Sequence, residues 1–337
     1  MPPTPEGRST PPRLADIAAR AGVSKSLTSL ALRGENGVSE DARRRVLDAA
    51  RSLGRHVTPH ALRMLGGTEM IGVLVTDLRN PFHVEVVLGI ENEADRSSVH
   101  VVNGARDIER MRGQLREFDT LGVAGVVIVS SWLPGEDVAR AGSRRPVVVI
   151  GSTVNHTPGT DTVRGDMRVG IRETVEHLVA SGHRRIGFVA ESERSSSRVR
   201  HAAFLEQTSR FLNDTATGAL HIDDLAADPA HLARLTRDRG VTAYIAANDV
   251  TAIALMGVAE RAGLRVPEDL AVAGYDNTTS SRLVRPALTT VDQPWERMGE
   301  RAFQMIRERT LGRSADREEV VTPHLVPRGS TAPVSRS

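Results

Sequence analysis

From residue 70 onward the sequence alternates short apolar runs with longer amphipathic stretches, and this alternation limits the possible folds more than any other feature. The run at 70–76 has the length of a strand, and the stretch at 82–95 has the apolar spacing of a helix. Valine and isoleucine fill such runs with few polar interruptions, which is typical of parallel strands covered on both faces. The pattern predicts an α/β core of doubly wound parallel sheets.

This alternation occurs in two sets of similar size. The first set predicts strands at 70–76, 99–103, 123–130 and 146–150, with helices at 82–95, 107–121 and 135–141. The second set predicts helices at 166–181, 198–212, 229–239 and 249–263, with strands at 185–190, 218–222, 241–247 and 270–275. Two such sets predict two lobes, with a ligand cleft at the carboxyl ends of their strands.

Three short helical segments precede the core. The first carries an apolar face at Leu14, Ile17, Ala18 and Ala21. Gly22 interrupts this helix, and Ser24 is a suitable N-cap for a second helix at 25–32. A third helix follows the cap Ser39 and ends at Gly54. A tight glycine turn between the first two helices is typical of a helix-turn-helix unit.

The charge of this front segment indicates its partner. Residues 13–65 hold ten basic and five acidic residues, a net charge of +5, although the whole chain carries only +2. A small basic unit on a large, mildly acidic body indicates contact with a polyanion. Together, the helices and the charge favour DNA binding over a purely structural helical bundle.

Several classes of function are excluded or disfavoured. The chain has no cysteine, which excludes disulfides, thiolate zinc sites and cysteine nucleophiles. It has no GxxxxGK[ST] loop, no GxGxxG after a strand, no HExxH and no GxSxG. No run of 18 apolar residues occurs, and residues 1–12 lack the apolar region of a secretory signal. We therefore expect a cytoplasmic binding protein without enzymatic activity, cofactor, metal or membrane contact.

A series of short motifs points to one family. They are LADIA at 14–18, AGVS at 21–24, GVSEDAR at 37–43, NPF at 80–82, GHRRIGF at 182–188, VPEDL at 266–270, GYD at 274–276 and PALTTV at 286–291. In this order and spacing, the sequence resembles the lactose-repressor family of bacterial transcription regulators over about residues 13–332.

The resemblance implies a periplasmic-binding-protein-like core that closes around a small effector, and a homodimer that binds a near-palindromic double-stranded operator. The absence of a leucine heptad near the C-terminus favours a dimer over a tetramer. The implied parts are a tail at 1–12, a helix-turn-helix domain at 13–58, a hinge at 59–69, a core at 70–330 and a tail at 331–337. Lobe 1 takes about 70–165 and 291–321, and lobe 2 about 166–290 and 322–330.

The resemblance also places the second helix in the major groove. The candidate DNA-binding residues of this helix are Lys25, Ser26, Thr28, Ser29 and Leu30. The family usually has Thr-Val-Ser-Arg where this chain has LTSL at 27–30. Because leucine cannot make the hydrogen bonds by which arginine reads guanine, Leu30 either contacts a thymine methyl or turns inward. We predict that the half-site differs from the common one at this position.

The hinge departs from the family as well. The family usually has a tyrosine and an asparagine before the hinge helix, and the segment RHVTPH at 55–60 lacks both. The minor-groove wedge is therefore Met64 or Leu65, and Leu65 is favoured because RML at 63–65 fits Arg-x-Leu. The alternative is that these residues pack on the core.

For the cleft, the resemblance implies residues from both lobes. The first-rank candidates are Asn80, Phe82, Arg200, Asn248 and Asp276, and the second-rank candidates are Arg194 and Ser196. The NPF motif lies just beyond the carboxyl end of a predicted strand, where a doubly wound lobe presents its ligand. Asp276 can accept hydrogen bonds from a hydroxyl or an amine, and the alternative for it is a turn residue.

One candidate comes from the sequence itself. Aromatic residues make up only 3% of the chain, and one of its two tryptophans, Trp132, follows the predicted strand at 123–130. It either stacks on a sugar or another ring in the cleft or makes a surface or interface contact. We expect a small polar effector, a sugar or a related metabolite, and both inducer and corepressor roles stay open.

Two other classes of function share this core. A solute-binding protein that feeds a transporter would have no use for residues 13–65. A cleft hydrolase would need carboxylates such as Asp249 and Asp276, and no activating partner is evident beside them in the sequence.

Overall fold

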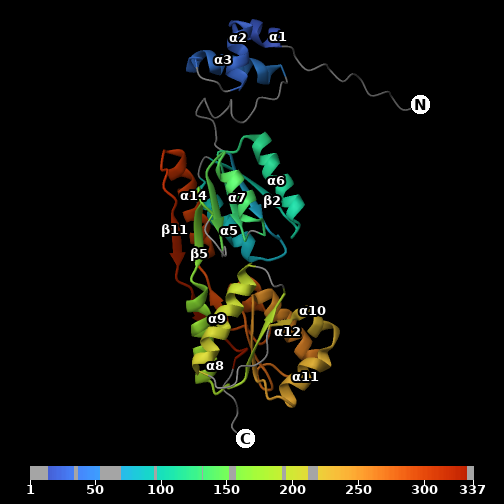
Figure 1. The fold of residues 1–337 in the computed structure, drawn as a ribbon. Helices are drawn as coiled ribbons and strands as arrows, with labels where there is room; N and C mark the ends of the chain where they lie inside the picture. The colour runs from blue at the N-terminus through green and yellow to red at the C-terminus, as the bar shows by residue number, and fades with distance from the viewer. Residues whose placement is uncertain are drawn as a thin grey trace, which may run out of the picture.

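The computed structural model describes residues 14–33, 37–53, 70–94, 97–130, 132–151, 157–191, 195–211 and 219–331. These residues form a small helical head and two α/β lobes, which lie end to end in Figure 1. The predicted helix-turn-helix head and parallel-sheet core are confirmed. Among the described residues, no helix combines the length and the apolar character that a membrane span requires.

In its described residues the head has three helices: α1 (Leu14–Ala21), α2 (Lys25–Arg33) and α3 (Glu40–Ser52). Gly22 makes the turn between α1 and α2 with a φ of 65°, a conformation that glycine adopts without strain. The small core of the head forms around Ile17, Val46 and Leu47, which are fully buried. Arg43, also buried, donates a hydrogen bond of 3.4 Å to the Ala31 carbonyl and so ties α3 to α2.

Lobe 1 contains a six-stranded sheet in which every neighbouring pair is parallel. Its order is β11 (Glu318–Val321), β5 (Asp161–Gly165), β4 (Val147–Ile150), β3 (Gly125–Val129), β1 (Met70–Val75) and β2 (Ser98–Asn103). The two edges of the sheet are therefore β11 and β2.

Helices cover both faces of this sheet. One face carries α5 (Phe82–Glu93) and α14 (Trp295–Thr310), and the other carries α6 (Ile108–Leu121) and α7 (Gly135–Gly142). Successive residues of β1 point to opposite faces of the sheet, because Val73 packs toward α5 and α14 whereas Leu74 packs toward α6.

The helices α5 and α14 approach each other closely through two glycines. A Cβ atom added to Gly89 would lie 2.6 Å from the carbonyl carbon and 2.7 Å from the Cα of Glu296. A Cβ atom added to Gly299 would lie 2.9 Å from the amide nitrogen of Ile90. Only glycine therefore allows the two backbones this separation.

Lobe 2 contains a four-stranded parallel sheet. Its order is β7 (Leu220–His221), β6 (Ile186–Ala190), β8 (Ala243–Ala246) and β9 (Ala271–Ala273). One face packs on α8 (Met167–Ala180) and α9 (Ser195–Phe211), and the other on α10 (Ile222–Ala227), α11 (Pro229–Arg237) and α12 (Asp249–Arg261). The short helix α13 (Thr279–Leu283) follows β9 along the chain.

The chain passes between the lobes three times. It leaves lobe 1 between β5 and α8, returns between β10 (Thr290–Asp292) and α14, and leaves again between β11 and β12 (His324–Val326). The strands β10 and β12 pair in antiparallel fashion beside the second lobe. Three short connections of this kind allow the lobes to rotate relative to each other as units.

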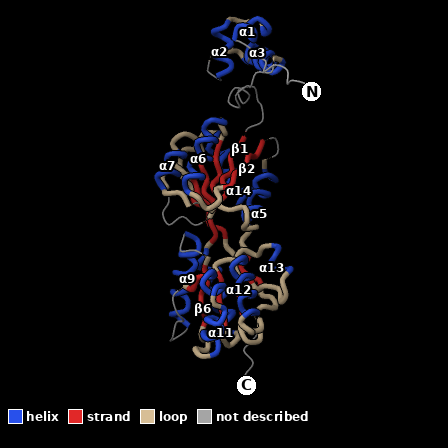
Figure 2. The backbone as a smooth tube through the Cα atoms, turned by 90° about the vertical axis from the view of Figure 1, so that its right-hand side faces the viewer, coloured by secondary structure: helices blue, strands red, loops and turns tan. Residues whose placement is uncertain are grey.

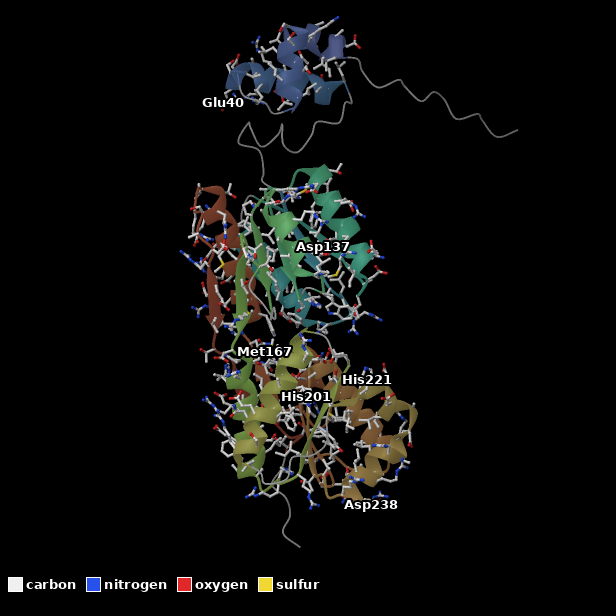
Figure 3. All side chains as sticks on the ribbon, in the orientation of Figure 1. Glu40, Asp137, Met167, His201, His221 and Asp238 are labelled. Atoms are coloured by element: carbon white, nitrogen blue, oxygen red, sulfur yellow. The ribbon has the colours of Figure 1, made fainter. Side chains whose placement is uncertain are left out.

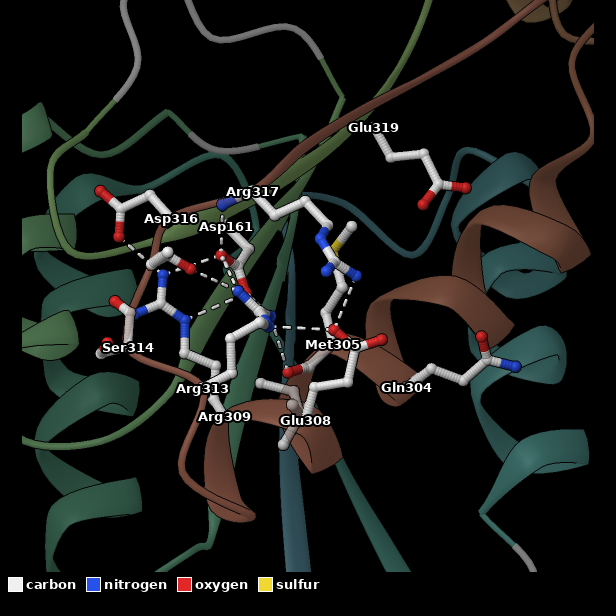
Figure 4. A network of polar contacts seen from close by, with 12 residues as sticks. Asp161, Gln304, Met305, Glu308, Arg309, Arg313, Ser314, Asp316, Arg317 and Glu319 are labelled. Atoms are coloured by element: carbon white, nitrogen blue, oxygen red, sulfur yellow. Dashed lines mark hydrogen bonds and ion pairs between the residues drawn. The ribbon is translucent and has the colours of Figure 1, made fainter.

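A buried carboxylate fixes the return of the chain from α14 into β11 (Figure 4). Asp161, at the start of β5, is fully buried and receives hydrogen bonds of 2.7 Å from Arg309 and 3.1 Å from Arg313. The Arg317 amide donates a further bond of 2.8 Å to it. Burial alone would raise the pKa of Asp161, but the hydrogen bonds from Arg313 and Arg309 hold it below its ordinary value.

Candidate DNA-binding face and ligand cleft

The second helix of the head presents four of its own five predicted DNA-binding residues toward solvent. Lys25 and Ser26 are exposed, and Ser29 and Leu30 are partly exposed. The fifth, Thr28, is fully buried, and its hydroxyl donates a 2.9 Å hydrogen bond to the carbonyl of Ser24. Thr28 therefore faces the interior of the head in this structure, whereas Leu30 does not turn fully inward.

The start of α2 is fixed by a capping bond. The Ser24 hydroxyl accepts a 3.1 Å hydrogen bond from the Leu27 amide, as the sequence pattern predicts for an N-cap. An exposed helix that begins with a lysine and carries no acidic residue can lie against DNA phosphates without repulsion. The hinge candidates Met64 and Leu65 lie outside the described residues.

A cleft that is partly open to solvent lies between the two lobes. Seven of the eight predicted effector-binding residues line it: Asn80, Phe82, Trp132, Ser196, Arg200, Asn248 and Asp276. The eighth, Arg194, lies outside the described residues. Met167, at the junction of the lobes in Figure 3, also lines the cleft.

Ten further described residues, which the sequence did not predict, line the cleft. These are Thr76, Asp77, His83, Arg106, Ser130, Gly151, Met167, Glu191, Gln293 and Trp295. Asp77 and Glu191 follow closely after the carboxyl ends of β1 and β6, so the strand-end rule that selected Trp132 also applies to them. Trp295, the second tryptophan, begins a helix directly after the chain has returned to lobe 1.

Two aromatic surfaces form the first-lobe wall. Phe82 and Trp295 begin α5 and α14, and their ring centroids lie 4.4 Å apart at an interplanar angle of 40°. The Trp295 indole donates a 2.9 Å hydrogen bond to the backbone carbonyl of Asp276, which fixes this ring against the second lobe. The Arg106 guanidinium lies 5.9 Å from the centroid of the Trp132 ring. Flat apolar faces of this kind suit a sugar or a heterocyclic ring.

A buried carboxylate organises the loop after β1. Asp77 forms ion pairs of 2.9 Å with Arg79 and 2.7 Å with Arg106. Burial would raise the pKa of Asp77, but the hydrogen bonds from Arg79 and the charge of Arg106 lower it below its ordinary value. The carboxylate stays ionised and pairs with both guanidinium groups, of which that of Arg106 lines the cleft.

His83 is neutral in this environment. Burial lowers its pKa to about 4, and its Nδ1 lies 2.5 Å from the Asp77 carbonyl oxygen. Because that carbonyl only accepts, Nδ1 carries the proton and Nε2 has an unshared lone pair. Among the described residues, Nε2 is buried without a partner.

The second-lobe wall is built around an arginine–aspartate pair. The Arg200 guanidinium lies 3.8 Å from the centroid of the Tyr275 ring, bonds to the Ala247 carbonyl and lies 3.3 Å from Asp276. Burial raises the pKa of Asp276 to about 7, although Arg200 acts in the opposite direction. Gln293 donates a second hydrogen bond of 3.3 Å to Asp276 from the segment between the lobes.

The backbone at Asp276 is strained, as often occurs at ligand sites. Its φ is 111°, a region that residues with side chains rarely occupy, and its amide donates a 2.9 Å bond to the Val291 carbonyl. The nearby Asn248 caps α12 by accepting a 2.8 Å bond from the Thr251 amide. Asp276 is thus both a turn residue and part of the cleft lining.

Glu191 completes this wall. Its carboxylate accepts hydrogen bonds of 3.3 Å from the Ser197 hydroxyl and 3.2 Å from the Thr251 hydroxyl. Within the described ranges, no cluster of three histidine, aspartate or glutamate side chains could hold a metal ion. The described lining of the cleft thus combines carboxylates, guanidinium groups and aromatic rings.

A helix-turn-helix head joined to a two-lobed core with a polar cleft defines a DNA-binding transcription regulator with a periplasmic-binding-protein-like ligand domain. Residues 13–56 match the family described as bacterial regulatory proteins, lacI family, and residues 175–331 match the periplasmic binding protein-like domain. The chain belongs to the lacI family.

Similar proteins span nearly the whole chain. The HTH-type transcriptional repressor PurR of Erwinia tasmaniensis is 30% identical over 329 residues, covering 94% of this chain and 96% of the relative. The lac repressor dimer bound to operator and the anti-inducer ONPF has a TM-score of 0.69 at 26% identity, covering 96% of this chain and all of that chain. The complex of the regulator CelR with cellobiose has a TM-score of 0.68 at 26% identity, covering 95% of this chain and 99% of that one.

Proposed function

We propose that this protein is a transcriptional repressor that binds a near-palindromic operator as a homodimer and responds to a small polar effector in the cleft. The proposal is supported by a basic head that is joined to a core with a cleft between two hinged lobes. Helix α2 of the head presents Lys25, Ser26, Ser29 and Leu30. The similar lac repressor is a dimer bound to its operator, and the similar CelR binds cellobiose. The protein acts in the cytoplasm, where its operator lies.

Exposed apolar side chains on both lobes support the homodimer. Val84 and Leu88 on α5 are 44% and 42% exposed, and Val250 on α12 and Leu283 on α13 are 46% and 71% exposed. Figure 2 shows α5 and α13 on the same side of the two lobes. Isolated apolar side chains are normal on a surface, whereas a set shared by two lobes suits a self-complementary interface.

The proposed mechanism is linkage between the cleft and the head. A ligand that contacts both Phe82 of lobe 1 and Asp276 of lobe 2 binds more tightly to the conformation with one angle between the lobes than to a conformation with another angle. In a dimer joined through both lobes, a change of this angle alters the separation of the two heads. Coupling of this type amounts to about 1–3 kcal/mol, or about 5- to 150-fold in operator affinity. The cleft binds the effector without chemical turnover.

Selection from random duplex DNA tests the proposed function. We expect purified protein, with and without a small-molecule cell extract, to enrich two inverted half-sites with centres about 10 base pairs apart. The variant Lys25→Ala should weaken binding to all sequences and lower its salt dependence. The control Arg261→Ala, which removes an exposed positive charge from lobe 2, should change neither. Failure to enrich any motif under both conditions would contradict the proposal, and turnover of a nucleoside or glycoside would contradict the absence of chemistry.

A further inference from the structure

The charged side chains of the cleft leave no surplus of positive charge for an anionic ligand. The described lining contains two arginines, Arg106 and Arg200, and three acidic residues, Asp77, Glu191 and Asp276. Arg106 is paired with Asp77 at 2.7 Å, and Arg200 is paired with Asp276 at 3.3 Å. Arg106 therefore has an ionised partner, and Arg200 has a partner whose raised pKa of about 7 leaves it partly ionised at neutral pH.

Glu191 is the acidic residue in excess. The structure gives it two hydroxyl donors, Ser197 and Thr251, and no basic partner among the described residues. Its charge also acts on Asp276, where it opposes ionisation. A second negative group placed in this part of the cleft would meet the same repulsion.

Recognition of a phosphate or a carboxylate in proteins normally uses a guanidinium fork whose donors are available to the ligand. In this cleft Arg200 directs its donors at the Ala247 carbonyl and at Asp276, and its side chain is only 6% exposed. Arg106 directs its Nε at Asp77. One further arginine, such as Arg194 outside the described residues, would bring the formal charge of the lining only to zero.

The remaining surfaces suit a ligand that donates hydrogen bonds. Glu191 and Asp276 present carboxylate oxygens, and Phe82, Trp132 and Trp295 present aromatic rings. Hydroxyl and amino groups on a flat ring would satisfy both kinds of surface.

We propose that the cleft takes an uncharged ligand rich in hydrogen-bond donors, that it rejects phosphate and carboxylate groups, and that Glu191 sets this selectivity. The proposal rests on the function proposed above, because it concerns the effector site of the same regulator. The proposed selectivity makes sugars and nucleosides candidate effectors and excludes their phosphate esters.

The two tryptophans provide a specific signal. Both tryptophans of the chain, Trp132 and Trp295, line the cleft. Intrinsic tryptophan fluorescence of the full-length protein therefore reports on occupation of this site. The probes are inorganic phosphate and two matched pairs, glucose with glucose 6-phosphate and adenosine with adenosine monophosphate.

In the wild-type protein we expect no response to inorganic phosphate, and no phosphate ester should bind more tightly than its uncharged parent. In Glu191→Gln, the phosphate-bearing probes should gain at least tenfold in affinity, because the shape is kept and one negative charge is removed. The control Glu260→Gln changes an exposed glutamate of α12 and should behave as wild type. Tighter binding of an ester by the wild type, or no gain in Glu191→Gln, would overturn the proposal.

The natural ligand gives a second test. The full-length protein is mixed with a small-molecule cell extract and re-isolated, and the released ligand is identified by mass spectrometry. An uncharged ligand supports the proposal, and a phosphorylated or carboxylated ligand overturns it. Operator selection is independent of this result, so a failure here is distinguishable from a failure of the proposed function.

Discussion

Replacement of Gly89 by alanine should destabilise lobe 1, because the new methyl group would overlap the backbone of α14. The added Cβ would lie 2.6 Å from the carbonyl carbon of Glu296, whereas carbon atoms prefer about 3.5–4.0 Å, so the helices must separate by about 1 Å. Overpacking costs about 1–3 kcal/mol, and an obstacle made of backbone places the cost at the upper end. The better helix propensity of alanine offsets about 1 kcal/mol, which leaves a net loss of about 2 kcal/mol.

Urea unfolding measured by tryptophan fluorescence reports this change, because Trp132 and Trp295 both belong to lobe 1. With a slope of about 2 kcal/mol per molar urea, the midpoint should fall by about 1 M. The matched control is Gly113→Ala on α6, where the nearest atom to the added Cβ is the Arg116 side chain at 3.8 Å. This control should gain about 0.5–1 kcal/mol. Equal or higher stability of Gly89→Ala would refute the close approach of α5 and α14.

Three further predictions concern the buried Asp161, the proposed DNA-binding helix α2 and the proposed dimer. Asp161→Asn should lower the free energy of unfolding by about 3–5 kcal/mol at neutral pH, because Arg309 and Arg313 lose their buried partner. The folded protein holds the pKa of Asp161 below its ordinary value. The difference in unfolding free energy between wild type and variant should therefore be present above about pH 4 and disappear as the pH falls through the pKa of Asp161 in the folded protein. Acid unfolding curves of the two proteins measure this. Leu30→Arg should shift the base preference toward guanine at one half-site position, and identical selected motifs would contradict this. Leu283→Asp should convert the dimer to a monomer in sedimentation measurements, and an unchanged mass would argue against a dimer interface that includes α13.

The sequence predicted the regular elements well where the apolar pattern was strong. The run at 70–76 became β1, and the helix predicted at 249–263 is α12, which spans Asp249–Arg261. The strand β5 was missed because it contains polar residues, among them the fully buried Asp161. The strand predicted at 218–222 has only the two residues of β7, at the edge of its sheet.

The residues of the candidate site could also be predicted from the sequence only in part. Trp132 could be selected from the fold class alone because it follows a predicted strand, whereas Asn80 was implied by the family resemblance and its place beyond a strand agrees with that. Gln293 and Trp295 could not, because they reach the cleft only through the return of the chain along β10 and α14. The burial of Thr28 depends on how α2 packs in the head, and an exposed hydroxyl and a buried one look alike in the sequence.

The coupling between the cleft and the operator is the property that most directly tests whether an effector in the cleft controls DNA binding. The affinity for the selected operator is measured with and without a small-molecule cell extract, for the wild type and for Asp276→Asn, which alters the cleft and leaves the head unchanged. Linkage between the two sites predicts a change of about 5- to 150-fold in the wild type and a much smaller change in the variant. An operator affinity that does not respond to the extract, or that responds equally in both proteins, would contradict it.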